Sequence, residues 1–360
     1  MDNPIPVTIL TGFLGAGKTT LLNRFLDSTN AKRALVIVNE FGSIGIDHHL
    51  MMFSSEESGL VALSSGCLCC TIRGDLTKTL KEAPWRFSRD GKRWFDQIII
   101  ETTGLADPAP IVQTLFAEPD IAKQYALTQI ITVVDSVNGI QTLEDQPEAC
   151  KQVAVADTIV VSKADLVDQA QQQSLRKRLR HLNPAAAIAI QNPAEIDPKT
   201  IFGCSKFNPK LKGESVKQWL AADAYDSDPH HHSHVDHNAH SHDENRHGDR
   251  IRSVCLRFAE PKPVKVFEAW FDHLARLRGS NLLRIKGILN VSELNVPMVI
   301  HGVQHIWHPP IILPSWPDDD HQSRVVFILR DLEKSDLLKA LSFITDRLDN
   351  AQLAGLPNEQ

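Results

Sequence analysis

The sequence predicts an α/β protein in which a parallel sheet carries helices on both faces, followed by a smaller α+β domain. Short apolar runs without alternation recur through the first half of the chain, as expected for parallel strands that are buried on both faces. Helical patterns separate several of these runs, which indicates alternating strands and helices. From about residue 250 alternating strands and two amphipathic segments follow, an order typical of one antiparallel sheet with two helices.

Composition narrows the function classes. The chain has 360 residues, enough for two domains, and its 42% hydrophobic and 23% charged residues are ordinary for a globular protein. The formal charge of -6 shows no basic excess, so we expect neither a nucleic-acid nor a membrane partner. No apolar run approaches the roughly 18 residues of a membrane span. The first residues lack the features of a signal peptide, so we expect a cytoplasmic protein.

The first domain is predicted to end near residue 205. A helix is expected from about Gly74 to Glu82, a surface loop over 84–94, and a second helix over 169–182. The buried strands are predicted at residues 7–10, 34–38, 60–63, 97–100, 130–134, 158–161 and 186–190.

A glycine-rich loop follows the first strand. Residues Gly12–Thr19 have the spacing G-x-x-x-x-G-K-[ST] between a strand and a helix, which is the pattern of a phosphate-binding P-loop, as in NTPases. Lys18 can reach the β- and γ-phosphates, and the Thr19 hydroxyl can bind Mg²⁺. The residues expected to bind the nucleotide here are Gly12, Gly15, Ala16, Gly17, Lys18, Thr19 and Thr20.

The strand at 97–100 ends in Glu101, with Gly104 three residues later. A carboxylate at this place behind a P-loop predicts an Mg²⁺ ligand, and Gly104 would let its backbone N–H approach the γ-phosphate. We expect Lys18, Glu101 and Gly104 to act in hydrolysis. Glu40, after the second strand, is a further candidate for Mg²⁺, although a solvated loop carboxylate explains it equally well.

The purine base of the nucleotide is predicted from Ser162-Lys163-Ala164-Asp165, which resembles the N-K-x-D guanine motif of G proteins. An aspartate at the position of Asp165 accepts two hydrogen bonds from guanine, and adenine offers no such pair of donors. The stem of Lys163 would pack on the purine. Serine replaces asparagine at 162, which is the one departure from the motif.

Three of the six cysteines, Cys67, Cys69 and Cys70, fall within four positions. Thiolates favour Zn²⁺ over Mg²⁺, and three of them can close three corners of a tetrahedral site. The fourth ligand must come from elsewhere, with Glu40 or a histidine as candidates. Ordinary structural cysteines and a redox role are the alternatives.

Residues 206–249 are expected to form a flexible, His-rich linker, because they contain few apolar residues and eight of the sixteen histidines. We interpret the tract as a loose collector of metal, with a purely solubilising linker as the alternative. The candidate ligands are His230, His231, His232, His234, His237, His240 and His242.

The second domain is predicted over residues 250–350. His301, His305 and His308 could add metal ligands there or simply pack beside Trp307. Its elements are expected as strands at 252–258, 282–289, 298–303 and 324–329, and helices at 264–277 and 333–344.

Several motifs together resemble the CobW-like family of metal-chaperone GTPases, and the resemblance covers nearly the whole chain. It is carried by Thr11–Thr20, Asn39–Gly42, Gly66–Cys70, Glu101–Pro108 and Ser162–Asp165, and by residues 283–287 and 301–310 of the second domain. The resemblance implies Mg²⁺-dependent GTP hydrolysis and delivery of a transition metal, usually Zn²⁺ and in some branches Co²⁺. It implies a metalloprotein client, and many members carry His-rich linkers.

The expected function is therefore a GTP-hydrolysing metallochaperone in which residues 39–47 and 101–108 order around the γ-phosphate and change the nearby cysteine loop. Glu40 and Asp107 are weak candidates for orienting the attacking water. A zinc-buffering protein that uses nucleotide only structurally is the alternative, and a small-molecule kinase is a further one. A dimer that depends on metal or nucleotide stays open.

Overall fold

The computed structural model describes residues 4–27, 33–41, 59–65, 69–190, 201–202, 220, 250–278 and 281–342. The chain divides into two compact units, residues 1–208 and 209–360, and each is described by itself. None of the described helices combines the length and the apolar content that a membrane crossing requires.

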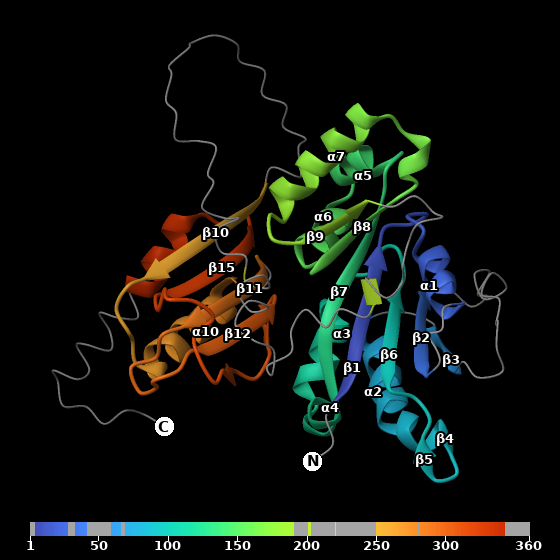
Figure 1. The fold of residues 1–360 in the computed structure, drawn as a ribbon, viewed down its shortest axis with the longest axis horizontal. Coiled ribbons are helices and arrows are strands. Elements are labelled where there is room, and N and C mark those ends of the chain that lie inside the picture. Colours follow the sequence, from blue (N-terminus) through green and yellow to red (C-terminus); the bar gives the residue numbers. More distant parts are fainter. Residues whose placement is uncertain are drawn as a thin grey trace. The chain divides into compact units, whose positions relative to one another are not determined.

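The first unit is built on a seven-stranded, wholly parallel sheet with the strand order β3-β2-β6-β1-β7-β8-β9 (Figure 1). The central strand β1 has neighbours that come from much later in the chain. The strands are β1 Ile5–Gly12, β2 Ala34–Phe41, β3 Gly59–Ser65, β6 Gln97–Thr102, β7 Tyr125–Asp135, β8 Thr158–Ser162 and β9 Ala187–Ile190. The predicted parallel sheet is confirmed, because every apolar run predicted as a strand lies in it.

Helices cover both faces of this sheet, as predicted. Phe25 of α1 and Phe202 pack together on one face, with ring centroids 4.4 Å apart, in a core that includes Leu10, Val36 and Ile131. Helix α6 lies on the other face, where the Thr132 hydroxyl donates to a carbonyl of α6. The helices are α1 Lys18–Leu26, α2 Cys69–Arg86, α3 Ala109–Ala117, α4 Pro119–Gln124, α5 Gly139–Asp145, α6 Pro147–Ala154 and α7 Gln169–Leu182, with the 3-10 turn Ala164–Leu166.

Two local expectations in this unit were wrong. Helix α2 begins at Cys69, before the predicted start near Gly74, and it continues through Pro84, because Leu76, Leu80 and Ala83 keep a buried stripe on it. The predicted loop over 84–94 contains a hairpin of β4 Ser88–Arg89 and β5 Lys92–Arg93. Its turn residues Asp90 and Gly91 both have positive φ, as a two-residue hairpin turn requires.

The second unit contains an antiparallel sheet with the strand order β10-β15-β11-β12-β13, and β14 pairs with β12. Helix α10, Val264–Arg278, and a helix over 334–342 pack on one face around Trp270, Phe267 and Phe327. The antiparallel sheet with two helices is confirmed. The strands are β10 Ile251–Phe258, β11 Leu282–Leu289, β12 Met298–Val303, β13 Ile306–Trp307, β14 Ile311–Ile312 and β15 Ser323–Arg330.

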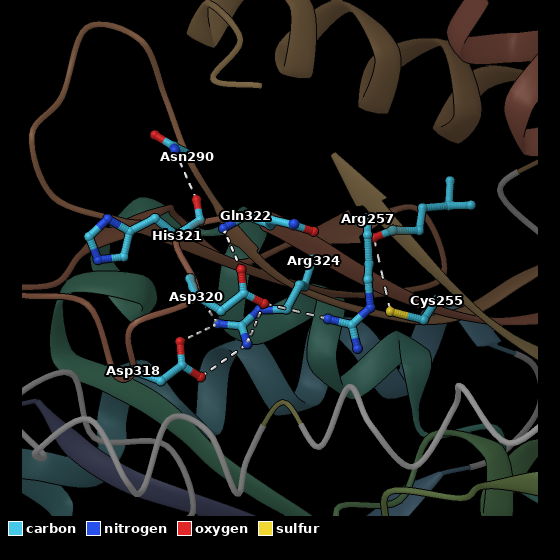
Figure 2. A network of polar contacts seen from close by, with 9 residues as sticks. Cys255, Arg257, Asn290, Asp318, Asp320, His321, Gln322 and Arg324 are labelled. Carbon is cyan, nitrogen blue, oxygen red and sulfur yellow. Dashed lines mark hydrogen bonds and ion pairs between the residues drawn. The ribbon is translucent and has the colours of Figure 1, made fainter. Parts of the chain in front are cut away.

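The opposite face of the second sheet buries several polar side chains among apolar ones. Arg284, Lys286, His301 and Arg324 alternate along their strands with residues of the apolar core, and each is less than 10% exposed. Arg324 donates two parallel hydrogen bonds of 3.0 Å to the carboxylate of Asp318 (Figure 2). The charge of Arg324 is therefore held by a partner from the loop that precedes its strand.

Candidate functional site: the nucleotide-binding edge

The glycine-rich loop joins β1 to α1 at the carboxyl edge of the sheet. Gly12 has φ +142°, and a Cβ added there would lie 2.3 Å from the carbonyl oxygen of Val133. Gly17, directly before α1, has φ +97°. Both positions require glycine, because a side chain would clash or strain the backbone. The loop therefore has the shape that brings its N–H groups and the helix N-terminus to one place.

Lys18 and Thr19 begin α1 and turn back over the loop. The Lys18 ammonium donates to the carbonyl oxygens of Gly12 at 2.9 Å and Phe13 at 3.3 Å. The Thr19 hydroxyl donates to a carboxylate oxygen of Glu101 at 3.1 Å. The predicted Mg²⁺ pair thus comes together from β6 and α1. A hydroxyl beside a carboxylate is a hard-oxygen set that suits Mg²⁺.

The segment after Glu101 packs against the glycine-rich loop. A Cβ added at Gly104 would lie 2.5 Å from the backbone nitrogen of Leu14, so only glycine permits this approach. The Asp107 carboxylate accepts the N–H of Ala109 at 2.9 Å and so supports the start of α3. This bond gives Asp107 a structural role, and its role in orienting the attacking water stays a prediction.

Ser162, which stands at the asparagine position of the guanine motif, bonds to the glycine-rich loop. Its hydroxyl donates to the Ala16 carbonyl at 2.6 Å. The serine therefore ties the end of β8 to the loop with its own hydroxyl. Asp165 follows in the 3-10 turn Ala164–Leu166, where its side chain is exposed. The loop and the base-reading segment are thus joined across the same edge of the sheet.

Lys163 has an ion-pair partner that we did not predict. Its ammonium lies 2.6 Å from a carboxylate oxygen of Asp135, the last residue of β7. Burial by itself would raise the pKa of Asp135, but hydrogen bonds from Lys163, the Val137 N–H and Asn138 outweigh it and hold the pKa below its usual value. The sequence held part of the signal for this ion pair, because Asp135 and Ser162-Lys163 each follow a predicted strand. The structure adds that the two strands are neighbours.

The proposed zinc ligands are placed only in part. Cys67 and the tract 230–247 lie outside the described residues, as do the side chains of Glu40, Cys69 and Cys70. The backbone nevertheless pairs Glu40 of β2 with Ser64 of β3, two residues before the Cys-containing segment begins at Gly66. Among the side chains that the structure does describe, no three His, Cys, Asp or Glu residues gather as a metal site.

The three histidines of the second unit do not form one cluster. The rings of His301 and His308 lie 4.5 Å apart, whereas His305 is exposed in the turn between β12 and β13. Trp307 packs on Phe271, with ring centroids 4.9 Å apart. A metal-binding role for these histidines and their packing beside Trp307 both stay predictions.

The family follows from comparison with known domains. The CobW/HypB/UreG nucleotide-binding domain matches residues 6–190, and the C-terminal domain of the cobalamin synthesis protein CobW matches residues 251–345. The chain belongs to the CobW/HypB/UreG family of GTPases. The matched nucleotide-binding domain contains the glycine-rich loop, and the predicted enzyme class, a GTPase, is confirmed.

Relatives of this CobW-family GTPase are named zinc chaperones or a zinc-regulated metalloprotein activator. Zinc chaperone YjiA of Escherichia coli is 29% identical over 340 residues, which cover 94% of this chain and 98% of YjiA. Zinc-regulated GTPase metalloprotein activator 1 of Schizosaccharomyces pombe is 38% identical over 201 residues, 54% of this chain and 47% of that protein. Zinc chaperone CobW of Pseudomonas aeruginosa is 47% identical over 139 residues, 37% of this chain and 36% of that protein.

The solved structures agree with the sequence comparison. The crystal structure of Zn(II)-bound YjiA from Escherichia coli matches this GTPase with a TM-score of 0.67 and 26% identity, covering 95% of this chain and 99% of YjiA. A Zn(II)-bound triple mutant of YjiA, with one glutamate and two cysteines replaced by alanine, also matches with a TM-score of 0.67 and 27% identity. The likeness spans both domains.

Proposed function

We propose that this GTPase is a metallochaperone that binds Zn²⁺ through Cys67, Cys69 and Cys70 and passes it to a client metalloprotein as GTP is hydrolysed. One observation carries the coupling. Strand β2 lies between β3, which leads into the cysteines, and β6, which ends in the segment Glu101–Thr102. The metal loop and the γ-phosphate segment therefore leave the same edge of the sheet with a single strand between them.

Glu40 is our candidate for the fourth zinc ligand. It stands near the end of that intervening strand, so its backbone adjoins both segments. The YjiA mutant that lacks a glutamate and two cysteines at the same spacing is itself Zn(II)-bound, so the candidacy of Glu40 rests on its place in the sheet. A carboxylate beside thiolates completes a four-ligand set that Zn²⁺ accepts. If Glu40 binds Zn²⁺, its candidacy for Mg²⁺ falls away, and Thr19 and Glu101 remain.

The nucleotide chemistry rests on residues of the loop edge. Thr19 and Glu101 would hold Mg²⁺, which would supply positive charge to the phosphates during hydrolysis. Lys18 leaves its two loop carbonyls for the phosphate oxygens, and the loop N–H groups stabilise the same charge. Asp165 selects guanine. Removal of the γ-phosphate releases the segment 101–108 and with it the neighbouring metal loop.

The client would receive the metal from a site with three thiolates and a carboxylate in place of a fourth thiolate, which suits transfer better than permanent storage. Metal binding requires that the three cysteines stay reduced, which fits a protein of the cytoplasm. Co²⁺ is the second candidate cargo, because the same soft and borderline ligands bind it. The tract 230–247 would collect metal loosely and raise its concentration near the tight site.

The decisive experiment measures Zn²⁺ affinity with GDP and with a non-hydrolysable GTP analogue, for the wild type and for a variant with Cys67, Cys69 and Cys70 changed to alanine. We expect the nucleotide to change Zn²⁺ affinity in the wild type only. Equal affinities and an equal nucleotide effect in both proteins would refute the proposed site. GTP turnover with stoichiometric Zn²⁺ or Co²⁺ identifies the preferred metal.

A deletion of residues 230–247 separates the chaperone from a zinc buffer. A chaperone keeps one tight site and its GTP turnover after the deletion, whereas a buffer loses most of its bound metal. The reaction product should be free phosphate. A phosphorylated small molecule would identify a kinase instead.

A further inference from the structure

Gln152 is a buried amide that joins α6 to the segment following Glu101. It is only 1% exposed, and its side-chain nitrogen donates to the carbonyl oxygens of Gly104 at 3.2 Å and Ala106 at 3.0 Å. Its own backbone carbonyl accepts the Thr132 hydroxyl at 2.7 Å. Both ends of the residue are therefore held, one by β7 and the other by the Gly104–Ala106 segment.

The orientation of the amide is fixed by its partners. Two carbonyl oxygens face it, and only the NH₂ end of a glutamine can donate to both. The oxygen end has no hydrogen-bond partner among the described residues. Both hydrogen bonds that the Gln152 side chain donates therefore go to peptide carbonyls of one short segment.

These two bonds set the direction of N–H groups. A trans peptide is planar, and its C=O and N–H point in opposite directions. Because the Gly104 and Ala106 carbonyls point toward Gln152, the N–H groups of Leu105 and Asp107 point away from α6. Gly104 meanwhile packs against the backbone of Leu14 in the glycine-rich loop. The segment is therefore held between the loop and Gln152.

Gln152 also borders the hollow beside the glycine-rich loop. A cavity of about 120 Å³ is lined by Gln152, by Phe13–Ala16 of the glycine-rich loop, and by Asp135 and Asn138. Gln152 therefore contacts the segment after Glu101 and also lines the space next to the loop.

We propose that Gln152 is a positioning residue for GTP hydrolysis, which holds the Gly104–Asp107 backbone in the conformation that receives the γ-phosphate. The proposal rests on the assignment of residues 101–108 to the γ-phosphate, and it does not depend on zinc. GDP lacks the γ-phosphate that this segment is proposed to receive. Gln152 therefore acts on the chemical step and on the preference for GTP over GDP.

The test compares Gln152→Leu with a matched control, Gln129→Leu. Gln129 is also 1% exposed, its side-chain nitrogen donates to the Ile201 carbonyl at 2.8 Å, and its oxygen end has no partner among the described residues. Both changes remove a buried amide from the first unit. Only Gln152 contacts the segment after Glu101.

We expect Gln152→Leu to lower kcat for GTP by about 10- to 30-fold, in proportion to two lost hydrogen bonds. Its GDP affinity should stay as in the wild type, so the ratio of GTP-analogue to GDP affinity falls. Gln129→Leu should lower thermal stability without changing either quantity. All assays are done without added zinc, so a failure of zinc coupling leaves the outcome unaffected.

Gln152→Glu gives a pH-dependent second test that does not rely on the leucine variant folding. An ionised carboxylate cannot donate and faces two carbonyl oxygens, whereas a protonated one regains a single donor. The kcat of this variant relative to the wild type should therefore rise as the pH is lowered. A flat ratio, an equal loss of GDP and GTP affinity, or a kcat matching that of Gln129→Leu would each overturn the proposal.

Discussion

The two units of the chain place their buried charges in different ways. In the first unit Lys18, Glu101 and Asp135 lie at the carboxyl edge of a parallel sheet, where loops meet and a ligand can reach them. In the second unit Arg324 lies along a sheet face, and its partner Asp318 comes from the preceding loop (Figure 2). We expect the first arrangement to serve binding and the second to serve stability, so substitutions in the two units should separate these effects.

The largest effect is expected from Arg324→Met, which leaves the Asp318 carboxylate without its bidentate partner. The side chain of Arg324 is only 6% exposed, so the second unit should lose about 3–5 kcal/mol of unfolding free energy in urea titration. GTP turnover at low temperature should remain.

Arg252→Met is the matched control for that experiment. Arg252 pairs with Glu333 at 3.1 Å, but both side chains are more than half exposed. Solvent screening should limit the loss to less than about 1 kcal/mol. Equal losses of unfolding free energy in Arg324→Met and Arg252→Met would show that burial does not make the Arg324–Asp318 pair more stabilising than the exposed pair.

The next largest effect is expected from Gly104→Ala in the first unit. The new Cβ would press on the backbone nitrogen of Leu14, displace the segment or the loop, and lower kcat for GTP by about 100-fold. The measurement is steady-state phosphate release. Gly91→Ala, in the hairpin turn between β4 and β5, is the control and should leave turnover unchanged while straining its own backbone. A Gly104 variant with wild-type turnover would contradict the close packing seen here.

Ser162→Ala should have a smaller effect, because it removes one hydrogen bond to the Ala16 carbonyl. A bond of about 1 kcal/mol corresponds to roughly a fivefold loss of affinity, shared equally by GDP and GTP. Titration with fluorescent nucleotides measures both. Ser88→Ala removes a similar bond, from the hairpin to the Trp85 carbonyl of α2, and should leave affinity unchanged. A loss confined to GTP would mean that Ser162 acts on the γ-phosphate segment instead.

The smallest effect is a pH dependence in the second unit. Burial lowers the pKa of His308 below its usual 6.5, although a hydrogen bond with the Pro309 carbonyl raises it in part. The unfolded chain therefore takes up a proton first, and stability falls as the pH drops below about 6.5 until the lowered pKa is passed. Urea midpoints between pH 8 and pH 5 should show this decline. His308→Gln should flatten it, and the exposed control His305→Gln should not.

Local patterns predicted much of the candidate site. The glycine-rich loop needs glycine at Gly12 and Gly17 whatever surrounds it, and Lys18 follows at a fixed distance, so the pattern is visible in one short stretch. The sheet was also predictable, since its strands are continuous apolar runs. Helices α3 to α6 were not predicted, because they are short and their patterns extend over only two turns.

Contacts between distant segments could not be predicted in the same way. The bond from Ser162 to Ala16 joins residues 146 positions apart, and that from Gln152 to Gly104 joins residues 48 apart. The motif that contains Ser162 does not indicate a bond to Ala16, and the residues around Gln152 form no recognised motif. Their partners are set by which strands become neighbours, and the order β6-β1-β7-β8 mixes early and late segments of the chain.

The sequence by itself determined the glycine-rich loop, the carboxylate of Glu101 and the guanine motif, because each depends on the conformation and chemistry of a few adjacent residues. Only the tertiary structure decided that Asp135 holds Lys163, that Gln152 holds Gly104, and that Arg324 is buried against Asp318. Those pairings depend on strand register and on which groups lose their water, and both are properties of the packed chain as a whole.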